Sequence, residues 1–386
     1  MSVTAAEGFV ASGLHAGIKR RKFDMAMVAT EDRRAVPCAA VFTRNKFTAP
    51  PVDLGRATLA ANGGKAAAVI VNSGNANAGT GAHGYKDAEA MAKATAEALQ
   101  IAASDVLVCS TGIIGTPLPM EPILSHTPKL AKKLSVNGAD DAARGILTTD
   151  HKTKQVVIKG STFTLGGMAK GCGMIAPNMA TMLAFLTTDA DVPRSVMQKA
   201  LKAASEASFN TLNVDGAMST NDTALLLASG RRGKADHDEF ASAVLAACRD
   251  LTLQMARDAE GMTRVAHVTV SGARTNDQAR VAAKAIVENN LVKCSWYGRD
   301  PYWGRLMAAA GSSMVELDIA ESRVSYGGIV VAKGGVGCDH DGQAVAEHMM
   351  GDEVEIEVHL GAGEGMAKMI GIDLGPGYIK ENSKTS

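Results

Sequence analysis

The regular alternation of apolar and polar residues is clearest at 352–360, near the C-terminal end of the chain. Four apolar residues fall on one side of an extended backbone there, namely Val354, Ile356, Val358 and Leu360. The acidic residues and His359 fall on the other side. A period of two is typical of a strand that buries one face and exposes the other. The segment therefore predicts a half-buried antiparallel strand.

Strand-like and helix-like patterns alternate along the rest of the chain. Continuous apolar runs at 65–72 and 105–109 predict buried strands, whereas the Ala- and Glu-rich segment 85–100 predicts a helix. Another helix is expected directly after Pro193, because proline is tolerated in the first turn. Five residues recur on one helical face further on: Phe240, Val244, Cys248, Leu251 and Met255. This mixture predicts a layered α/β or α+β fold with substantial antiparallel sheet.

The chain has 386 residues, of which 46% are hydrophobic, so it is long enough for two domains. A shift in composition at 275–278, where the sequence reads TNDQ, is the best candidate for a boundary. We therefore expect a main domain at 1–275 and a smaller α/β domain at 276–386.

The charge pattern argues against nucleic-acid and membrane partners. Lys plus Arg and Asp plus Glu each number 40, and aromatic residues make up only 4%. The basic run 19–22 is short, and we interpret it as a solvated turn. No apolar stretch is long enough to cross a membrane, and the first residues lack the apolar core of a signal peptide. A cytoplasmic protein is therefore expected.

Cysteine and histidine spacing gives no support for a metal site. The six cysteines are scattered without a CxxC pair, and the nine histidines show no HExxH spacing. This pattern is typical of reduced thiols in the cytoplasm rather than of a disulfide framework or a zinc site. We expect neither a metal nor a bound cofactor.

The bond between Ala180 and Thr181 carries the most specific chemistry. Thr181 follows a loop with glycine and proline and opens an apolar, strand-like run. A hydroxyl in that place can attack the preceding peptide bond and expose a new N-terminal threonine. That residue would hold a nucleophile, Oγ1, beside a base, its α-amino group, whose usual pKa is about 7.7–8.0. Local chemistry alone also allows an ordinary first residue of a strand.

Several long motifs occur in a fixed order along the chain. They include VNSGNANAGTG from Val71, STGIIG from Ser110, TTD from Thr148, KGCGMIAPNMATML from Lys170, SFNTLNVDGAMSTNDT from Ser208 and YIKENS from Tyr378. On these motifs the chain resembles the ornithine acetyltransferases, the glutamate N-acetyltransferases of arginine biosynthesis. The resemblance implies an αββα sandwich, similar in outline to N-terminal-nucleophile hydrolases, followed by a smaller α/β domain.

The resemblance also implies how the chain matures and reacts. The precursor is expected to cut itself between Ala180 and Thr181 into fragments 1–180 and 181–386 that stay associated. Thr181 then takes an acetyl group from N-acetylornithine and passes it to glutamate in a ping-pong reaction. Thr111 and Gly112 match the family's oxyanion hole. Without the resemblance, they would be interpreted as a simple turn after the strand at 105–109.

Five further positions, besides Thr181 itself, match substrate-binding residues of the family: Thr148, Lys170, Glu260, Asn382 and Ser386. A cation at Lys170 suits the carboxylate shared by ornithine and glutamate, and Glu260 suits an ammonium group. From the residues alone, both are equally well explained as solvated surface charges. Thr149 stays an alternative to Thr148, and Thr385 an alternative to Ser386.

Three other functions remain open at this stage. They are an amidohydrolase or aminopeptidase with the same nucleophile, an acetyltransferase of a specialised pathway, and a binding protein that kept the fold. The sequence also leaves open whether acetyl-CoA serves as a second donor, and whether the enzyme is regulated by feedback. The resemblance suggests two copies of each fragment, an α2β2 heterotetramer, or a larger assembly.

Overall fold

The computed structural model describes residues 2–176 and 182–383, and its N-terminal half begins with a four-stranded sheet. The order in this first sheet is β1-β2-β5-β6, in which β5 and β6 are parallel and the other neighbours antiparallel. The strands are β1 (Phe9–Leu14), β2 (Met25–Thr30), β5 (Ala68–Asn75) and β6 (Val106–Ile113).

The second sheet has six strands in the order β4-β3-β11-β9-β8-β7. Its members are β4 (Lys65–Ala66), β3 (Val36–Phe42), β11 (Thr223–Lys234), β9 (Leu183–Asp191), β8 (Thr164–Lys170) and β7 (Lys154–Lys159). The central strands β9 and β11 are parallel to each other, and every other pair is antiparallel. Strands that precede residue 180 therefore flank, on both sides, two strands that follow residue 181.

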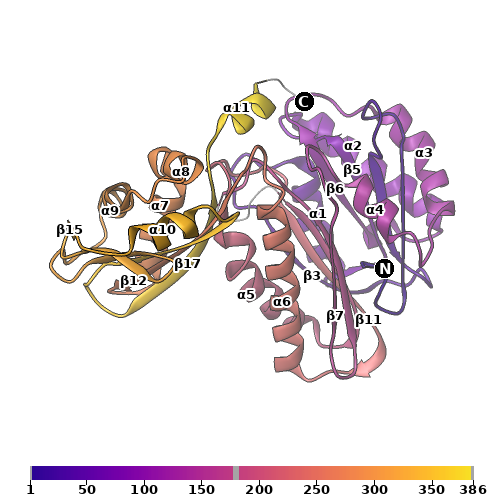
Figure 1. Ribbon diagram of the computed structural model, residues 1–386. Coiled ribbons are helices and arrows are strands. Elements are labelled where there is room, and N and C mark those ends of the chain that lie inside the picture. The colour runs from indigo at the N-terminus through magenta and orange to yellow at the C-terminus, as the bar shows by residue number, and fades with distance from the viewer. Residues whose placement is uncertain (1, 177–181, 384–386) are drawn as a thin grey trace.

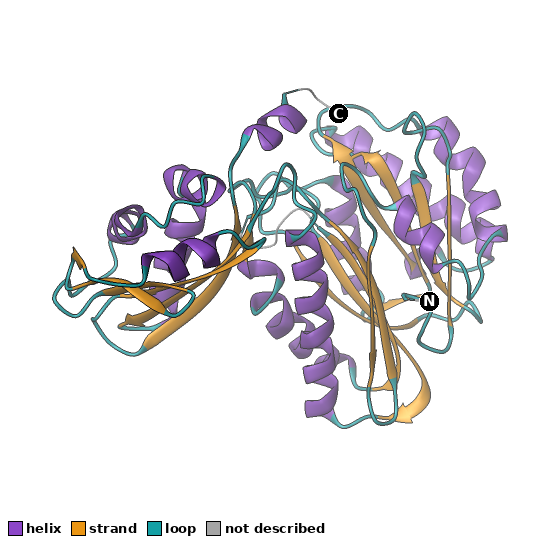
Figure 2. Cartoon of the chain, in the orientation of Figure 1, coloured by secondary structure: helices purple, strands orange, loops and turns teal. Residues whose placement is uncertain are grey.

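The two sheets pack face to face with helices on their outer faces, as Figures 1 and 2 show. Val28, Val69 and Leu107 of the first sheet share a buried core with Phe185 and Leu225 of the second. Helices α2 (Gly81–Leu99) and α3 (Met120–Lys132) cover the first sheet, and α5 (Arg194–Glu206) and α6 (His237–Ala256) cover the second. The predicted αββα sandwich is confirmed.

Shorter elements complete this sandwich. Helix α1 (Pro50–Ala61) lies against β6 and α2, and α4 (Ala139–Gly145) packs on β1 and β2. Two short 3₁₀ turns, η1 (Ala103–Asp105) and η2 (Phe209–Thr211), precede β6 and the two-residue strand β10 (Leu212–Asn213).

A third sheet forms the smaller unit, which stands beside the sandwich in Figure 1. Its order is β10-β17-β12-β16-β13-β14-β15. The strands after β10 are β12 (Val265–Ala273), β13 (Arg323–Tyr326), β14 (Ile329–Lys333), β15 (Val336–Gly337), β16 (Glu353–His359) and β17 (Gly365–Ile372). Its core is shared with α7 (Asn276–Glu288), α8 (Asn290–Tyr297), α9 (Trp303–Ser312) and α10 (Gly342–Met349).

Strand β12, which ends before residue 276, already belongs to the third sheet, so the composition shift at 275–278 does not mark where that sheet begins. Val268 and Val270 of β12 are buried against α7, and β12 pairs with β16 and β17 in the third sheet. The polar residues at 275–278 instead start α7, because the Thr275 hydroxyl accepts a hydrogen bond from the Gln278 amide. A helix N-cap and a domain boundary have the same polar composition, which explains the difference.

The last helix, α11 (Pro376–Asn382), extends from the smaller unit back toward the sandwich, as the yellow ribbon in Figure 1 shows. It brings the C-terminal segment close to the ends of the sandwich strands. Among residues 2–176 and 182–383, no helix combines the length and the apolar character needed to cross a bilayer.

Candidate active site

A cavity of about 680 Å³ opens where β6 and β8 end in the sandwich. Six of the site residues expected from the sequence line it together: Thr111, Gly112, Thr148, Lys170, Glu260 and Asn382. They come from both sheets, from the loops after α4 and α6, and from α11. Segments more than 250 residues apart in the sequence therefore meet in one cavity.

Thr111 and Gly112 lie at the end of β6, where its parallel pairing with β5 becomes irregular. Gly112 has a φ of +134°, which side-chain-bearing residues rarely adopt. A Cβ on this residue would also come within 2.3 Å of the Gly74 carbonyl carbon. Thr111 is 4% exposed and lines the cavity, and its hydroxyl lies 3.2 Å from Lys170 Nζ. The turn thus combines a hydroxyl with a glycine that allows close approach, as an oxyanion hole requires.

Buried amides hold this turn in place. The Asn221 amide nitrogen donates to the carbonyl oxygens of Ala76 and Ser110 at 2.6 and 2.9 Å. The Ser110 hydroxyl in turn donates to the Asn72 side-chain oxygen at 2.6 Å. Each of these groups is less than a tenth exposed, so their hydrogen bonds fix the ends of β5 and β6.

Lys170 is the last residue of β8 and is only 2% exposed. Its Nζ donates to the Thr111 hydroxyl at 3.2 Å. No carboxylate among the described residues lies within 4.0 Å of this nitrogen as an ion-pair partner. The alternative interpretation, a solvated loop lysine, is wrong, because the side chain is buried and faces the cavity.

Thr148 and Thr149 both line the cavity, and the structure gives them different partners. Thr148 donates through its backbone N–H to Asp150 Oδ2 at 3.1 Å, and its hydroxyl lies 3.4 Å from the same oxygen. Thr149 donates its hydroxyl to Glu260 Oε1 at 2.6 Å. Thr148 therefore depends on Asp150 for its position, whereas Thr149 is hydrogen-bonded to Glu260, the protein carboxylate that is expected to bind substrate.

Behind these threonines lies a buried ion-pair cluster formed by Asp150, Lys154 and Asp258. Lys154 Nζ is 2.5 Å from Asp150 Oδ1 and 2.5 Å from Asp258 Oδ2. Burial alone would raise the pKa of Asp150, but Lys170 and Lys154 together with hydrogen bonds hold that pKa below its usual value. Asp150 also accepts from the Gly171 amide at 2.8 Å, and so links the Thr148 turn to the end of β8.

Glu260 is buried, with 7% exposure, and is not the surface carboxylate that its place after a helix also allowed. Its Oε2 accepts from the Asn382 side-chain amide at 2.8 Å, and its backbone N–H donates to the Cys172 carbonyl. Gly173 lies so close that a Cβ there would meet the carboxylate at 2.3 Å. The contact with Asn382 places α11 at the cavity.

Ala180, Thr181, Ser386 and Thr385 lie outside the described residues. The next residue, Met182, is the first one that the structure describes after this gap. Its N–H donates to Asp222 Oδ1 at 2.9 Å, and its carbonyl accepts from the Thr223 amide. Asp222 is fully buried, and this burial raises the pKa of its carboxyl well above the usual value. The segment after the expected cleavage point is therefore anchored to the start of β11.

Some residues in the cavity wall and behind it had no assigned role in the sequence analysis. Of the three residues in the ion-pair cluster, only Asp150 lies in a quoted motif, TTD. Lys154 and Asp258 lie in none, and only the fold brings Asp258 close to the other two. Lys19 and Arg20 belong to the basic run that was interpreted as a solvated turn, yet both line the cavity.

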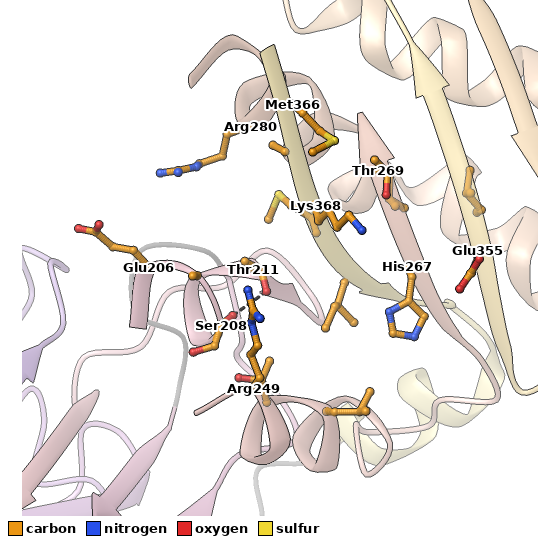
Figure 3. A pocket seen from close by; sticks show the side chains of 18 of the residues that line it. Glu206, Ser208, Thr211, Arg249, His267, Thr269, Arg280, Glu355, Met366 and Lys368 are labelled. Atoms are coloured by element: carbon orange, nitrogen blue, oxygen red, sulfur yellow. Dashed lines mark hydrogen bonds between the residues drawn. The ribbon is translucent and has the colours of Figure 1, made fainter. Parts of the chain in front are cut away.

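A second cavity, of about 670 Å³, lies between α6 and the open face of the third sheet. Figure 3 shows Arg249 of α6 on one side and His267 and Lys368 on the strands opposite. Its charged side chains are of both signs, and none of the described site residues expected from the sequence lines it. The expected chemistry thus belongs to the first cavity.

Within residues 2–176 and 182–383, no group of His, Cys, Asp and Glu side chains is arranged to hold a metal ion. The first cavity instead offers a hydroxyl and glycine turn beside a buried cation, with a buried carboxylate in the same cavity. Fold and site together define an enzyme that transfers an acyl group.

The ArgJ family model matches residues 10–386 of the chain. A Caldanaerobacter subterraneus relative named arginine biosynthesis bifunctional protein ArgJ is 44% identical over 393 residues, which cover 97% of this chain and 96% of the relative. A Mycobacterium tuberculosis relative of the same name is 43% identical over 398 residues, with 100% and 96% coverage. The solved Bacillus halodurans protein of that name is 35% identical, covers 51% of this chain and 96% of its own, and has a TM-score of 0.49.

The chain belongs to the ArgJ family, the ornithine acetyltransferases of arginine biosynthesis. The family predicted from the ordered motifs is thereby confirmed.

Proposed function

We propose that this enzyme moves an acetyl group from N-acetylornithine to glutamate through an ester on Thr181, after cutting itself between Ala180 and Thr181. Both substrates are amino acids or their derivatives, and glutamate is a zwitterion at neutral pH. The products are ornithine and N-acetylglutamate. Acetyl-CoA is a candidate second donor for the same ester.

The observation that supports this most strongly is the pair of buried opposite charges in one cavity. Lys170 and Glu260 are 2% and 7% exposed, and neither forms an ion pair with another described residue. Lys170 has only the longer-range attraction of Asp150, and the side-chain partners of Glu260 are neutral, so the two charges suit a ligand that brings its own carboxylate and ammonium group. Hydrolysis of the same acyl donor would use these two charges as well, so the dependence on glutamate, measured below, distinguishes transfer from hydrolysis.

The proposed self-cleavage uses the same groups as turnover. Thr181 Oγ1 attacks the Ala180 carbonyl carbon, the C–N bond breaks, and the hydroxyl proton passes to the departing nitrogen. Water then hydrolyses the ester, leaving a carboxylate on Ala180 and a free amine on Thr181. Thr111 and the Gly112 N–H are the proposed donors to the negatively charged oxygen of the tetrahedral intermediate.

In turnover, the free α-amino group of Thr181 takes the proton of its own hydroxyl as Oγ1 attacks the acetyl carbonyl. The acetyl C–N bond breaks, and the released ornithine amine receives that proton. The glutamate amine then attacks the ester, and Thr181 recovers its hydroxyl proton. The roles of Thr148, Asn382 and Ser386 in holding the substrates are part of this proposal.

The first test is the denaturing intact mass of freshly purified protein. Two species that correspond to 1–180 and 181–386 are expected from the wild type, and a single chain from Thr181→Ala. Thr181→Ser keeps a hydroxyl and is expected to cleave. Normal cleavage of Thr181→Ala would remove Thr181 as the nucleophile.

The second test separates acetyl transfer from hydrolysis. Mature protein is incubated with N-acetylornithine, with and without glutamate, and ornithine, acetate and N-acetylglutamate are quantified. Glutamate-dependent formation of N-acetylglutamate is expected. Acetate formed at the same rate without glutamate would favour the amidohydrolase, and no reaction would favour a binding protein. Light scattering of the mature sample checks the expected α2β2 or larger assembly.

A further inference from the structure

Asp215 lies just outside the active-site cavity, and its carboxylate is bonded to two separate segments that line it. The described residues give this carboxylate four hydrogen bonds. Three donors are the backbone N–H groups of Met174, Ile175 and Ala217, at 2.6, 3.0 and 3.1 Å. The fourth is the Tyr378 hydroxyl of α11, at 3.2 Å. One side chain thus joins the loop after β8 to the C-terminal helix, although the proposed function gives it no role.

The loop after β8 is held in an uncommon conformation at this contact. Met174 has a φ of +54°, in the left-handed region that residues with a side chain rarely adopt. Such a backbone persists only where the surrounding structure holds it, and the Met174 N–H is bonded to Asp215 Oδ2. Gly173 and Met174 both line the cavity. The shape of this part of the cavity wall therefore depends on Asp215.

The same loop lies directly against Glu260, the carboxylate proposed to bind an ammonium group. A Cβ on Gly173 would come within 2.3 Å of Glu260 Oε2. The Glu260 N–H donates to the Cys172 carbonyl at 2.9 Å. A shift of this loop would therefore change the space in which the Glu260 carboxylate is held.

Helix α11 provides a second connection between Asp215 and Glu260. Its first turn carries Tyr378, which donates to Asp215, and its last turn carries Asn382, which donates to Glu260 Oε2 at 2.8 Å. A Cβ on Gly261 would come within 2.0 Å of the Tyr378 nitrogen, so the residue after Glu260 packs on the start of this helix. Glu260 thus contacts both the loop and α11, and Asp215 is bonded to both.

The smaller unit fixes the position of Asp215 itself. Strand β10, which ends two residues earlier, pairs with β17 of the third sheet. The Lys293 ammonium group of α8 donates to the Val214 carbonyl, and Lys293 is only 3% exposed. The Val214 N–H donates to the Ile175 carbonyl at 2.8 Å. The carboxylate is therefore held by a rigid sheet rather than by a free loop.

We propose that Asp215 is a positioning residue for Glu260, and that it thereby sets the preference of the enzyme for an acyl donor with a side-chain ammonium group. This inference rests on the proposed function. The α-nitrogen of N-acetylornithine is acylated, so the side-chain ammonium is the only one that this donor can present to Glu260. The contact belongs to the first half of the reaction, because glutamate has no ammonium group on its side chain.

The test compares two donors, N-acetylornithine and N-acetylnorvaline, which has a hydrogen atom in place of the terminal ammonium group. In a ping-pong reaction, kcat/KM for the donor describes the first half-reaction alone, so it is measured for each donor with glutamate as acceptor. The proteins are mature wild type, Glu260→Gln, Asp215→Asn and Tyr378→Phe. Asp215→Asn keeps one oxygen as an acceptor and replaces the other by an NH₂ group, which cannot accept from the Met174 N–H.

The matched control is Asp341→Asn. Asp341 also accepts from two backbone N–H groups, those of Gln343 and Ala344 at the start of α10, and it does not line the cavity. This variant should match wild type with both donors.

Wild type should prefer N-acetylornithine, and Glu260→Gln should lose most of that preference. Asp215→Asn should lower kcat/KM for N-acetylornithine about tenfold, the effect of weakening one hydrogen bond to a charged group, and change that for N-acetylnorvaline less than about twofold. Tyr378→Phe removes a single donor to Asp215 and should lower kcat/KM for N-acetylornithine about threefold.

An equal fall with both donors in Asp215→Asn would mean general damage to the site and would overturn the inference. An unchanged preference in Asp215→Asn or in Glu260→Gln would overturn it as well. If intact mass shows that Asp215→Asn stays a single chain, Tyr378→Phe decides the question by the same comparison. Failure of the proposed function has a different signature, since the wild type would then not convert N-acetylornithine.

Discussion

Lys154 holds two buried carboxylates together, and replacing it by methionine gives a stringent test of the site's electrostatics. Its Nζ lies 2.5 Å from oxygens of both Asp150 and Asp258, and the three residues are 1%, 1% and 5% exposed. Methionine keeps the length of the side chain but removes the charge and all donors. Two carboxylates would then share a buried site that holds no cation between them.

Breaking a buried pair by removing one partner typically costs about 3–5 kcal/mol of folding free energy. The backbone donors that remain, at Gly171 for Asp150 and at His151 and Lys152 for Asp258, place the expected loss near the lower end of that range. This loss should depend on pH. In the wild type, the pKa of Asp150 is lowered on folding, so its contribution is present above the unfolded pKa and is lost as the pH falls.

In Lys154→Met, burial without the cation raises the carboxylate pKa values, so the folded variant takes up protons that the unfolded chain does not. Its deficit relative to wild type should therefore be largest near pH 8 and shrink toward pH 5. Urea unfolding at both pH values checks this, with both proteins in the Thr181→Ala background so that the chain remains single. The control Lys152→Met changes an exposed neighbour and should stay within about 0.5 kcal/mol.

A loss below about 1 kcal/mol at pH 8, or the same loss at both pH values, would refute this account of the cluster. If Lys154→Met loses the expected free energy of unfolding, it should also bind substrate less well. Because Asp150 fixes the Thr148 N–H, the variant should bind N-acetylornithine more weakly, which a KM measurement detects.

Two further predictions concern the cavity, and a third concerns the segment after the expected cleavage point. Thr111→Val should lower kcat by about 10²-fold while Thr111→Ser retains most activity, and equal rates would remove this hydroxyl from the reaction. Gly112→Ala should lose activity by at least as much, because its φ is +134° and its Cβ would collide with the backbone of β5. Gly115→Ala also has a positive φ, +85°, but its Cβ would meet open space, so it should be milder in the same kinetic assay. Asp222→Ala should lose about 1–3 kcal/mol in unfolding experiments by leaving the Met182 N–H without its acceptor, and Asp222→Asn, which keeps that acceptor, should lose less.

Local periodicity predicted many of the elements well. The alternating segment forms β16, whose burial alternates as expected, and the five apolar residues at 240–255 are all buried on α6. The prediction that this strand is antiparallel holds for only one of its two neighbours, because β16 is antiparallel to β13 but parallel to β12. The alternation of apolar residues does not depend on the direction of the neighbouring strand. The run at 65–72 divides at Ala67, because β4 and β5 belong to different sheets.

The site was predictable only as far as the ordered motifs extended. The family resemblance supplied Thr111, Lys170 and Glu260, but spacing could not show that Lys170 and Glu260 are buried, since a lysine or glutamate at the end of an element is usually exposed. Asp258 and Lys154 are 104 positions apart, and their ion pair depends on α6 lying against β7. Contacts of this kind follow from tertiary packing, and no pattern in the sequence around either residue indicates them.

The interleaved second sheet has a consequence for making the two halves of the protein separately. β8 and β3 belong to the N-terminal half and flank β9 and β11 of the C-terminal half through continuous ladders. Either half alone would present bare strand edges, which invite aggregation. Two genes that each encode one half should therefore yield soluble protein only when they are expressed together, and a stop codon at position 181 should leave an insoluble product.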